Sequence, residues 1–244
     1  MAATKLRSLI VLASAAALVI TVPTLATAQP GGGAGDGDYE IALKSRTFTP
    51  SPGIDEQGIR QGKGPRDDVH FYAQFTDLPN APRRAEIAGQ GVDLLDYVVG
   101  NTYIAVSSVS DLDTLRELDD LRWAGPIAED DKISPALRRG EIGKWAQAGK
   151  GRILISAQGH ADIGSDEISA LVERGNGEVV SETEATRSVI AIVAPGQVRE
   201  LSKADPIQYL AVVEPRLEGQ VDMSGPTSAW TPSGPRPTTS TAPE

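Results

Sequence analysis

The sequence predicts an α+β protein with two tandem ferredoxin-like βαββαβ domains, in which each antiparallel sheet carries its helices on one face. Two observations support this fold class. The stretch from residue 89 onward is echoed 86 residues later without a gap, so that Gly89-Gln90-Gly91 aligns with Gly175-Asn176-Gly177 and residues 103–106 align with residues 189–192. Both copies also show strand and helix patterns in the same order. A repeat of fixed period sets the architecture, and two copies are too few for a solenoid.

The composition narrows the class of protein. The chain has 244 residues, a formal net charge of −10 and no cysteine. This charge argues against a nucleic-acid surface and against binding to anionic lipid. Apolar residues make up 40% of the chain and aromatic residues only 5%, so the cores must be mainly aliphatic. Without cysteine, no disulfide supports these cores.

Residues 1–28 have the pattern of a secretory signal peptide. Lys5 and Arg7 precede an apolar run over residues 9–22, and Ala26-Thr27-Ala28 is a small-x-small cleavage site. We therefore expect a secreted, extracellular protein that is cleaved after Ala28 and no longer contacts the membrane. The alternative is an uncleaved membrane anchor, but the apolar run is shorter than the roughly 20 residues that a spanning helix needs.

Residues 29–68 are expected to form a flexible N-terminal segment. The first ten residues are rich in glycine and have nothing to bury. Residues 39–44 can pair as an edge strand, which the prolines and glycine of residues 49–53 then break. Residues 55–68 are polar and indicate a loop.

The first repeat is expected over residues 69–128. Its strands are predicted at residues 69–75, 92–99, 102–107 and 121–127 from their β-branched and aromatic content. Gly100-Asn101 indicates a two-residue hairpin turn between the two middle strands. A short helix is predicted at residues 81–88. A second helix is predicted at residues 111–120, where four leucines recur every three residues and Ser110 can cap the start.

Residues 129–151 are charged and contain glycine, which predicts a linker between the repeats. The second repeat, over residues 152–218, has expected strands at residues 152–158, 178–182, 188–193 and 207–213. Ser165 can cap its first helix, which carries Asp166 and Glu167 in the first turn, and Pro195 opens its second helix. Residues 219–244 are rich in Pro, Ser and Thr and are expected to be a disordered tail.

The strand at residues 188–193 carries apolar side chains on both faces, because successive side chains of a strand alternate. The side of the sheet away from the helices is therefore also apolar, and a monomer rarely leaves such a patch in water. Either the two repeats bury these faces against each other, or this face docks another protein.

The residues of catalytic and metal sites are sparse. The chain has two histidines, of which His70 lies in a predicted strand and is interpreted as structural. His160 belongs to a His-x-Asp pattern, a weak signal for metal binding or acid–base chemistry. Two histidines far apart and no cysteine make zinc improbable. The acidic run Glu129-Asp130-Asp131 is interpreted as solvated linker. We expect no catalytic residue, no metal and no cofactor.

The second repeat resembles the inhibitor-type propeptide, or prodomain, of bacterial secreted subtilisin-like serine peptidases. The resemblance rests on Glu173-Arg174-Gly175-Asn176-Gly177-Glu178-Val179, on the apolar strand at residues 189–193, and on Leu201-Ser202-Lys203-Ala204-Asp205-Pro206 before a last strand that closes on Glu214. The first repeat looks like a diverged second copy, with Leu94-Leu95-Asp96-Tyr97 and Arg122-Trp123-Ala124-Gly125-Pro126.

The resemblance implies a domain that binds its peptidase, assists its folding and then inhibits it. In that family the open sheet face packs on two helices of the enzyme, acidic residues after the last strand cap those helices, and the tail lies along the substrate cleft. The residues implied to bind the partner are Ile190, Ala191, Ile192, Glu214 and Glu218.

Nothing after Pro215 resembles the Asp, His and Ser segments of a subtilisin-like peptidase, so we expect no enzyme activity from this chain. The peptidase partner would be encoded downstream or act in trans, and the chain could equally be the N-terminal part of a peptidase precursor. The alternative from a different class is a secreted, non-catalytic binding or structural module.

Overall fold

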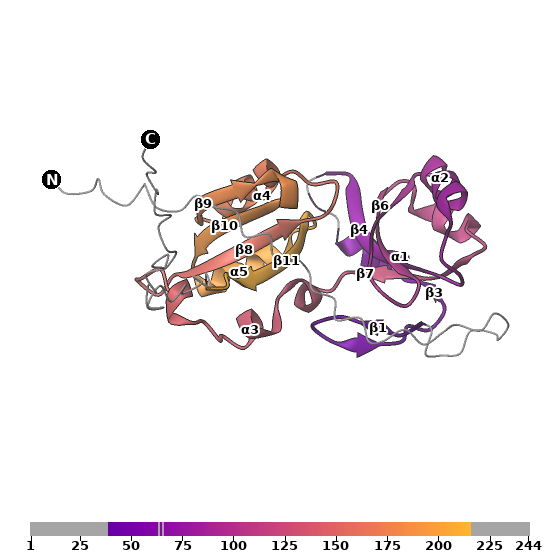
Figure 1. The fold of residues 1–244 in the computed structure, drawn as a ribbon. Coiled ribbons are helices and arrows are strands. Elements are labelled where there is room, and N and C mark those ends of the chain that lie inside the picture. Colours follow the sequence, from indigo (N-terminus) through magenta and orange to yellow (C-terminus); the bar gives the residue numbers. More distant parts are fainter. Residues whose placement is uncertain (1–38, 63, 65, 216–244) are drawn as a thin grey trace, which may run out of the picture. The chain divides into compact units, whose positions relative to one another are not determined.

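The computed structural model describes residues 39–62, 64 and 66–215 (Figure 1). The predicted signal peptide, the glycine-rich lead, Glu218 and the predicted tail lie outside the described residues. The described residues up to Glu214 belong to one compact unit. The protein is an α+β protein with one mixed and one antiparallel sheet as its two main sheets. None of the helices described is long and apolar enough to cross a membrane.

The first half of the chain forms a sheet in the order β3-β7-β4-β6-β5. Strands β4 to β7 pair antiparallel, and the short β3 pairs parallel with β7. The helices of this half are α1, α2 and the 3-10 helix η2. The elements are β3 (Gly53–Ile54), α1 (Glu56–Gln61), β4 (Asp68–Phe75), α2 (Ala81–Gly89), β5 (Val92–Tyr97), β6 (Thr102–Ser108), η2 (Leu112–Glu117) and β7 (Leu121–Pro126).

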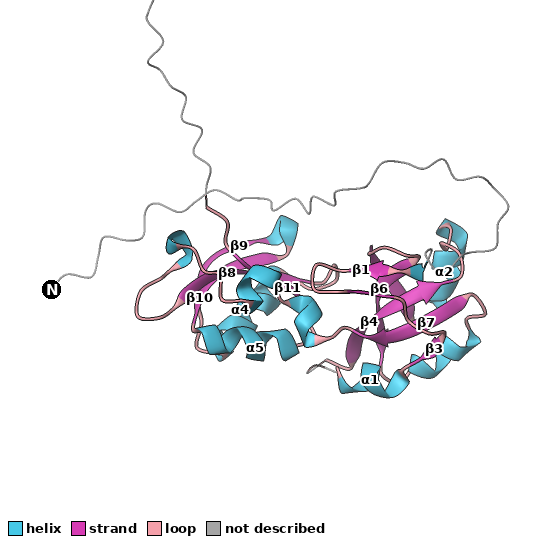
Figure 2. Ribbon diagram, turned by 90° about the horizontal axis from the view of Figure 1, so that it is seen from below, coloured by secondary structure: helices cyan, strands magenta, loops and turns pink. Residues whose placement is uncertain are grey.

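The second half forms an antiparallel sheet in the order β11-β8-β10-β9. Helices α4 and α5 lie side by side on one face of this sheet (Figure 2). Their apolar residues pack with alternate residues of the strands to form an aliphatic core. The elements are β8 (Ile153–Gly159), α4 (Ser165–Arg174), β9 (Glu178–Thr183), η5 (Glu184–Thr186), β10 (Ser188–Val193), α5 (Pro195–Lys203) and β11 (Ile207–Val212).

The two halves share one strand order. Taking four strands from each, the last pairs with the first, the first with the third and the third with the second, as β7-β4-β6-β5 and as β11-β8-β10-β9. Strands β5, β6 and β7 begin at residues 92, 102 and 121, and β9, β10 and β11 begin at residues 178, 188 and 207, which is 86 residues later each time. The repeat in the sequence therefore corresponds to a repeat of the strands in the structure.

The hairpin turn between β5 and β6 forms as predicted. Gly100 and Asn101 have φ values of 61° and 55°, which the mirror-image turn of a two-residue hairpin requires. A side chain at position 100 would also bring its Cβ to 2.4 Å from the carbonyl oxygen of Glu40, so the N-terminal segment passes directly over this turn.

Helix α1 lies where the sequence indicated a loop. The helix has only six residues and contains Gly58, so its own propensity is too low for a prediction. Tertiary packing supplies the missing stability, because Ile59 is fully buried in the first core and the Asp55 side chain accepts a hydrogen bond from the Gly58 N–H at the helix start.

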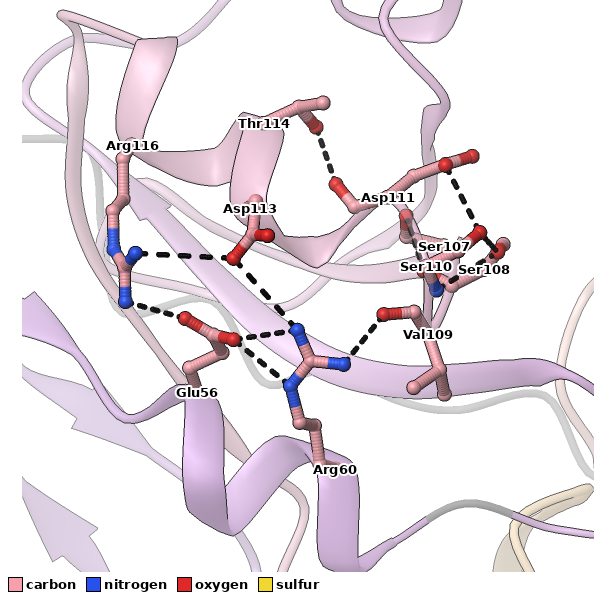
Figure 3. Close-up of polar contacts among 10 residues, drawn as sticks. All are labelled: Glu56, Arg60, Ser107, Ser108, Val109, Ser110, Asp111, Asp113, Thr114 and Arg116. Carbon is pink, nitrogen blue, oxygen red and sulfur yellow. Dashed lines mark hydrogen bonds and ion pairs between the residues drawn. The ribbon is translucent and has the colours of Figure 1, made fainter.

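An ion-pair network holds α1 against η2 (Figure 3). Glu56 lies between Arg60 and Arg116, at 2.6 Å and 2.5 Å, and Arg60 also donates to the carbonyl oxygen of Val109 at 2.7 Å. The hydrogen bonds from Arg60 lower the pKa of Glu56 despite partial desolvation. The network joins the segment before β4 to the segment after β6.

The helix predicted at residues 111–120 forms as the 3-10 helix η2 and is shorter than predicted. Its leucines recur every three residues, which matches the three residues per turn of a 3-10 helix better than the 3.6 of an α-helix. Leu112, Leu115 and Leu118 are buried on one side. The helix begins after Asp111, and its N-cap position makes no side-chain hydrogen bond, so the predicted cap by Ser110 was wrong.

Residues 129–151 contain η3 (Glu129–Lys132), α3 (Pro135–Arg138) and η4 (Lys144–Ala146). Ile133 pairs with Leu210 of β11, and Ile133 and Leu137 belong to the second core. The acidic run here is not uniformly solvated as expected, since Glu129 and Asp130 are exposed but Asp131 is buried.

We predict that Ile59→Ala destabilises the protein by about 2–5 kcal/mol, because it leaves a cavity in the first core at the only buried residue of α1. Gln57→Ala, on the exposed side of the same helix, is the matched control and should change the free energy of unfolding by less than about 0.5 kcal/mol. Urea denaturation measures both. Equal effects of the two substitutions would show that α1 does not pack on the core.

Candidate functional site

Each main sheet has a second face, turned away from its helices. In β4 the residues on this face are His70, Tyr72 and Gln74, because Val69, Phe71 and Ala73 belong to the first core. His70, Tyr72 and Gln74 are 5%, 4% and 0% exposed. The second face of the first sheet is therefore covered.

The N-terminal segment, residues 39–50, provides part of this cover. Its strands β1 (Ile41–Ala42) and β2 (Thr47–Phe48) pair with each other, so the predicted strand joins a small hairpin and not the edge of a main sheet. Gln74 donates to the carbonyl oxygen of Tyr39 at 2.9 Å. Trp123 lies between the rings of Tyr72 and Phe48, at centroid distances of 6.4 Å and 6.0 Å.

A charged pair joins this segment to η3. Arg46 donates from Nη2 to Asp131 Oδ2 at 2.8 Å and from Nε to both carboxylate oxygens at 3.0 Å and 3.2 Å, and Ser45 donates to Oδ1 at 2.6 Å. The Asp131 side chain is fully buried. The side-chain hydrogen bond with Asp131 raises the pKa of Arg46 further above its usual value, although burial opposes this. These hydrogen bonds explain why Asp131 is buried while the rest of the acidic run is exposed.

The second face of the second sheet is different, because its side chains are partly exposed. In β10, Val189, Ala191 and Val193 are buried against the helices, whereas Ile190 and Ile192 point away from them. Leu154 lies opposite Ile192, and the N–H of Val213 bonds to the carbonyl oxygen of Leu154. The outward apolar residues, which we call the open face, are Leu154, Ile190, Ile192, Tyr209, Ala211 and Val213.

The described parts of the chain contact the open face at its margins. The Lys44 ammonium group lies 5.1 Å from the centre of the Tyr209 ring. Trp145 donates from its indole N–H to the carbonyl oxygen of Val213 at 2.9 Å and remains 56% exposed. On the far side, Arg152 pairs with Glu178 of β9 at 3.3 Å, so the apolar surface has a charged border.

The residues implied to bind a partner are divided by this geometry. Ile190 and Ile192 lie on the open face, Glu214 is exposed two residues after β11, and Glu218 lies outside the described residues. Ala191 is fully buried on the helix side and presents no surface. Trp145 was missed because the charged residues around it indicated a linker. Its being one of only three tryptophans was the one available signal.

The two histidines, 90 residues apart in the sequence, are neighbours in space. Their rings are stacked with centroids 3.9 Å apart and an angle of 8° between the planes. His70 lies in a strand as predicted, but it also contacts two carboxylates of the second half, Asp162 and Asp205. The described residues contain no group of three or more His, Cys, Asp or Glu side chains that could hold a metal ion.

A family model described as "Domain of unknown function (DUF8729)" matches residues 42–128. The match runs from the N-terminal hairpin through β7, so it includes both the first sheet and part of the segment that covers it. No curated protein and no solved structure matches the chain.

We predict that Asp131→Ala destabilises the protein by about 1–3 kcal/mol, because Arg46 and Ser45 lose a buried acceptor. The control is Asp130→Ala, the exposed neighbour, which should cost less than about 1 kcal/mol. Thermal and urea unfolding measure the difference. If the two variants unfold alike, the Arg46–Asp131 pair does not hold the N-terminal segment in place.

Proposed function

We propose that this chain is a secreted propeptide-like protein that binds, helps to fold and inhibits a subtilisin-like serine peptidase. The observation that carries this proposal is the open face, an apolar sheet surface that stays partly exposed while the equivalent face of the first sheet is covered. A cluster of apolar side chains that the chain's own elements leave partly exposed is consistent with an interaction surface. The proposal includes the assignment of both halves as ferredoxin-like domains, which their common strand order supports.

The apolar residues of the open face supply most of the proposed affinity. Ile192 of β10 lies opposite Leu154 of β8, and Val213, the residue after β11, bonds to Leu154 on the other side, so the three form a row. Ile190 lies beside this row. Each square ångström of apolar surface removed from water contributes roughly 25 cal/mol. The resemblance to subtilisin propeptides implies that this row would pack on two helices of the peptidase.

Glu214 supplies orientation. It is exposed and follows the end of β11 by two residues, next to the open face. A carboxylate there can accept hydrogen bonds from the free backbone N–H groups at a helix start of the partner. Such an interaction is worth about 0.3–1 kcal/mol when exposed, so it contributes less than the apolar row.

An inhibition assay against a panel of secreted bacterial subtilisin-like peptidases tests the proposal. Ile190→Asp should weaken inhibition at least about 100-fold, because apolar surface that is buried in the complex is replaced by a charge that loses its water there. Glu214→Gln should weaken inhibition only about 2–5-fold.

The matched control is Leu78→Asp, which places the same charge at an exposed apolar residue in a loop of the first half. This variant should inhibit as the unmodified protein does. If the folded protein inhibits no member of the panel, the chain is instead a non-catalytic binding or structural module. Equal effects of Ile190→Asp and Leu78→Asp would exclude the open face as the binding surface.

A further inference from the structure

The two halves meet at His70. This residue is in β4 of the first half, and it forms hydrogen bonds with two loops of the second half. The backbone N–H of His70 donates to Asp205 Oδ1 at 2.9 Å. Its ring nitrogen Nδ1 lies 2.6 Å from Asp205 Oδ2, and Nε2 lies 2.9 Å from Asp162 Oδ1. One buried side chain therefore links two loops of the other half.

The geometry defines the charge of His70. An ionised carboxylate only accepts hydrogen bonds, so both ring nitrogens must donate and the ring must be the imidazolium form. Burial alone would lower the pKa of His70, but the hydrogen bonds with Asp162 and Asp205 outweigh it and raise this pKa above the usual value.

His160 has the opposite environment. Its ring is fully buried against the face of His70, and neither ring nitrogen has a hydrogen-bond partner among the described residues. Burial lowers the pKa of His160 well below its usual value, and the neighbouring positive charges of His70 and Lys132 lower it further. The stacked pair thus carries one positive charge, on His70.

Other charged groups surround this pair from every side. Lys132 of η3 is buried and donates to the carbonyl oxygen of Ala204 at 3.0 Å. Arg187 precedes β10, and Arg66 pairs with Asp68 and with Glu167 of α4. The charged groups around the histidines are Arg66, Asp68, Lys132, Asp162, Glu167, Arg187 and Asp205.

We propose that His70 and His160 form a one-proton latch that holds the two halves together near pH 6.5 and releases them on acidification. When the junction opens, both rings enter water and titrate near the ordinary value of about 6.5.

The sign of the pH dependence follows from counting protons. Below about pH 6.5 both histidines are charged in the open state, whereas only His70 is charged in the closed state. Closing therefore releases a proton, and acid favours opening. Above this pH neither histidine is charged in the open state and His70 is still charged in the closed state, so closing takes up a proton until the raised pKa of His70 is passed. The closed junction is therefore most stable near pH 6.5.

Two neighbouring groups, Lys132 and Asp162, keep their charges throughout the acid window. Burial lowers the pKa of Lys132 only to about 8, so this residue stays charged throughout the acid window. Burial would raise the pKa of Asp162, but the bond with His70 and its charge lower it, so Asp162 stays ionised there too. The stability from Asp162 is present above its usual pKa of about 4 and is lost only below it.

Histidine-labelled NMR of the full chain tests the charge assignment directly, because the chain has only two histidines. While the junction is closed, we expect one ring to stay doubly protonated on the alkaline side of the ordinary histidine pKa of about 6.5, and the other to stay neutral on its acid side. Two rings that both titrate near 6.5 in the folded protein would overturn the proposal.

Spin labels test the opening itself. The chain has no cysteine, so Glu117→Cys and Glu173→Cys, both at exposed sites, place one label in each half. The open fraction should rise up to tenfold per pH unit as the pH falls from about 6.5 to 5, seen as a broadening of the distance distribution. His160→Phe keeps a ring that can stack on His70 but cannot take up a proton, so it should abolish this broadening. A distribution that is independent of pH, or that broadens equally in His160→Phe, would contradict the latch.

Discussion

The helices of each half cover only one face of its sheet, and the rest of this structure depends on what covers the other face. In the first half, residues 39–50, η3 and two loops of the second half bury His70, Tyr72 and Gln74. In the second half the equivalent residues of β8, β10 and β11 remain partly exposed. Two sheets with the same strand order therefore present different surfaces. Among the residues that the structure describes, only the second sheet leaves this face open to a partner.

The covering of the first sheet also explains where polar residues are buried. Gln74 cannot reach water, and it donates to carbonyl oxygens of Tyr39 and Gly100. Asp131 is buried because it accepts from Arg46 and Ser45. His70 lies on the same face, where the second half packs. Gln74, Asp131 and His70 each bond to a segment distant in sequence, which makes the cover specific rather than merely apolar.

Local patterns in the sequence were sufficient for the four main strands of each half, but not for the two-residue strand β3. Alternating burial along β10 separates Ile190 and Ile192 from Ala191, and the Gly100-Asn101 turn follows from its residue types alone. Helix α1 could not be predicted, because a six-residue helix with a glycine depends on the burial of Ile59 by distant residues. The stacked histidines were equally hidden, since no local pattern reports a contact across 90 residues. Residues 129–151 resembled a linker in composition because their few buried residues, such as Ile133 and Leu137, are widely spaced.

The central claim is that the open face of the second sheet is the surface that a peptidase contacts. Methyl NMR of the isoleucine-labelled protein measures this contact most directly, with a bacterial subtilisin-like peptidase inactivated at its catalytic serine as the partner. The account predicts that the methyl signals of Ile190 and Ile192 shift or broaden on binding, while that of Ile104, buried on the covered face of the first sheet, does not. Changes at Ile104 without changes at Ile190 and Ile192 would contradict it.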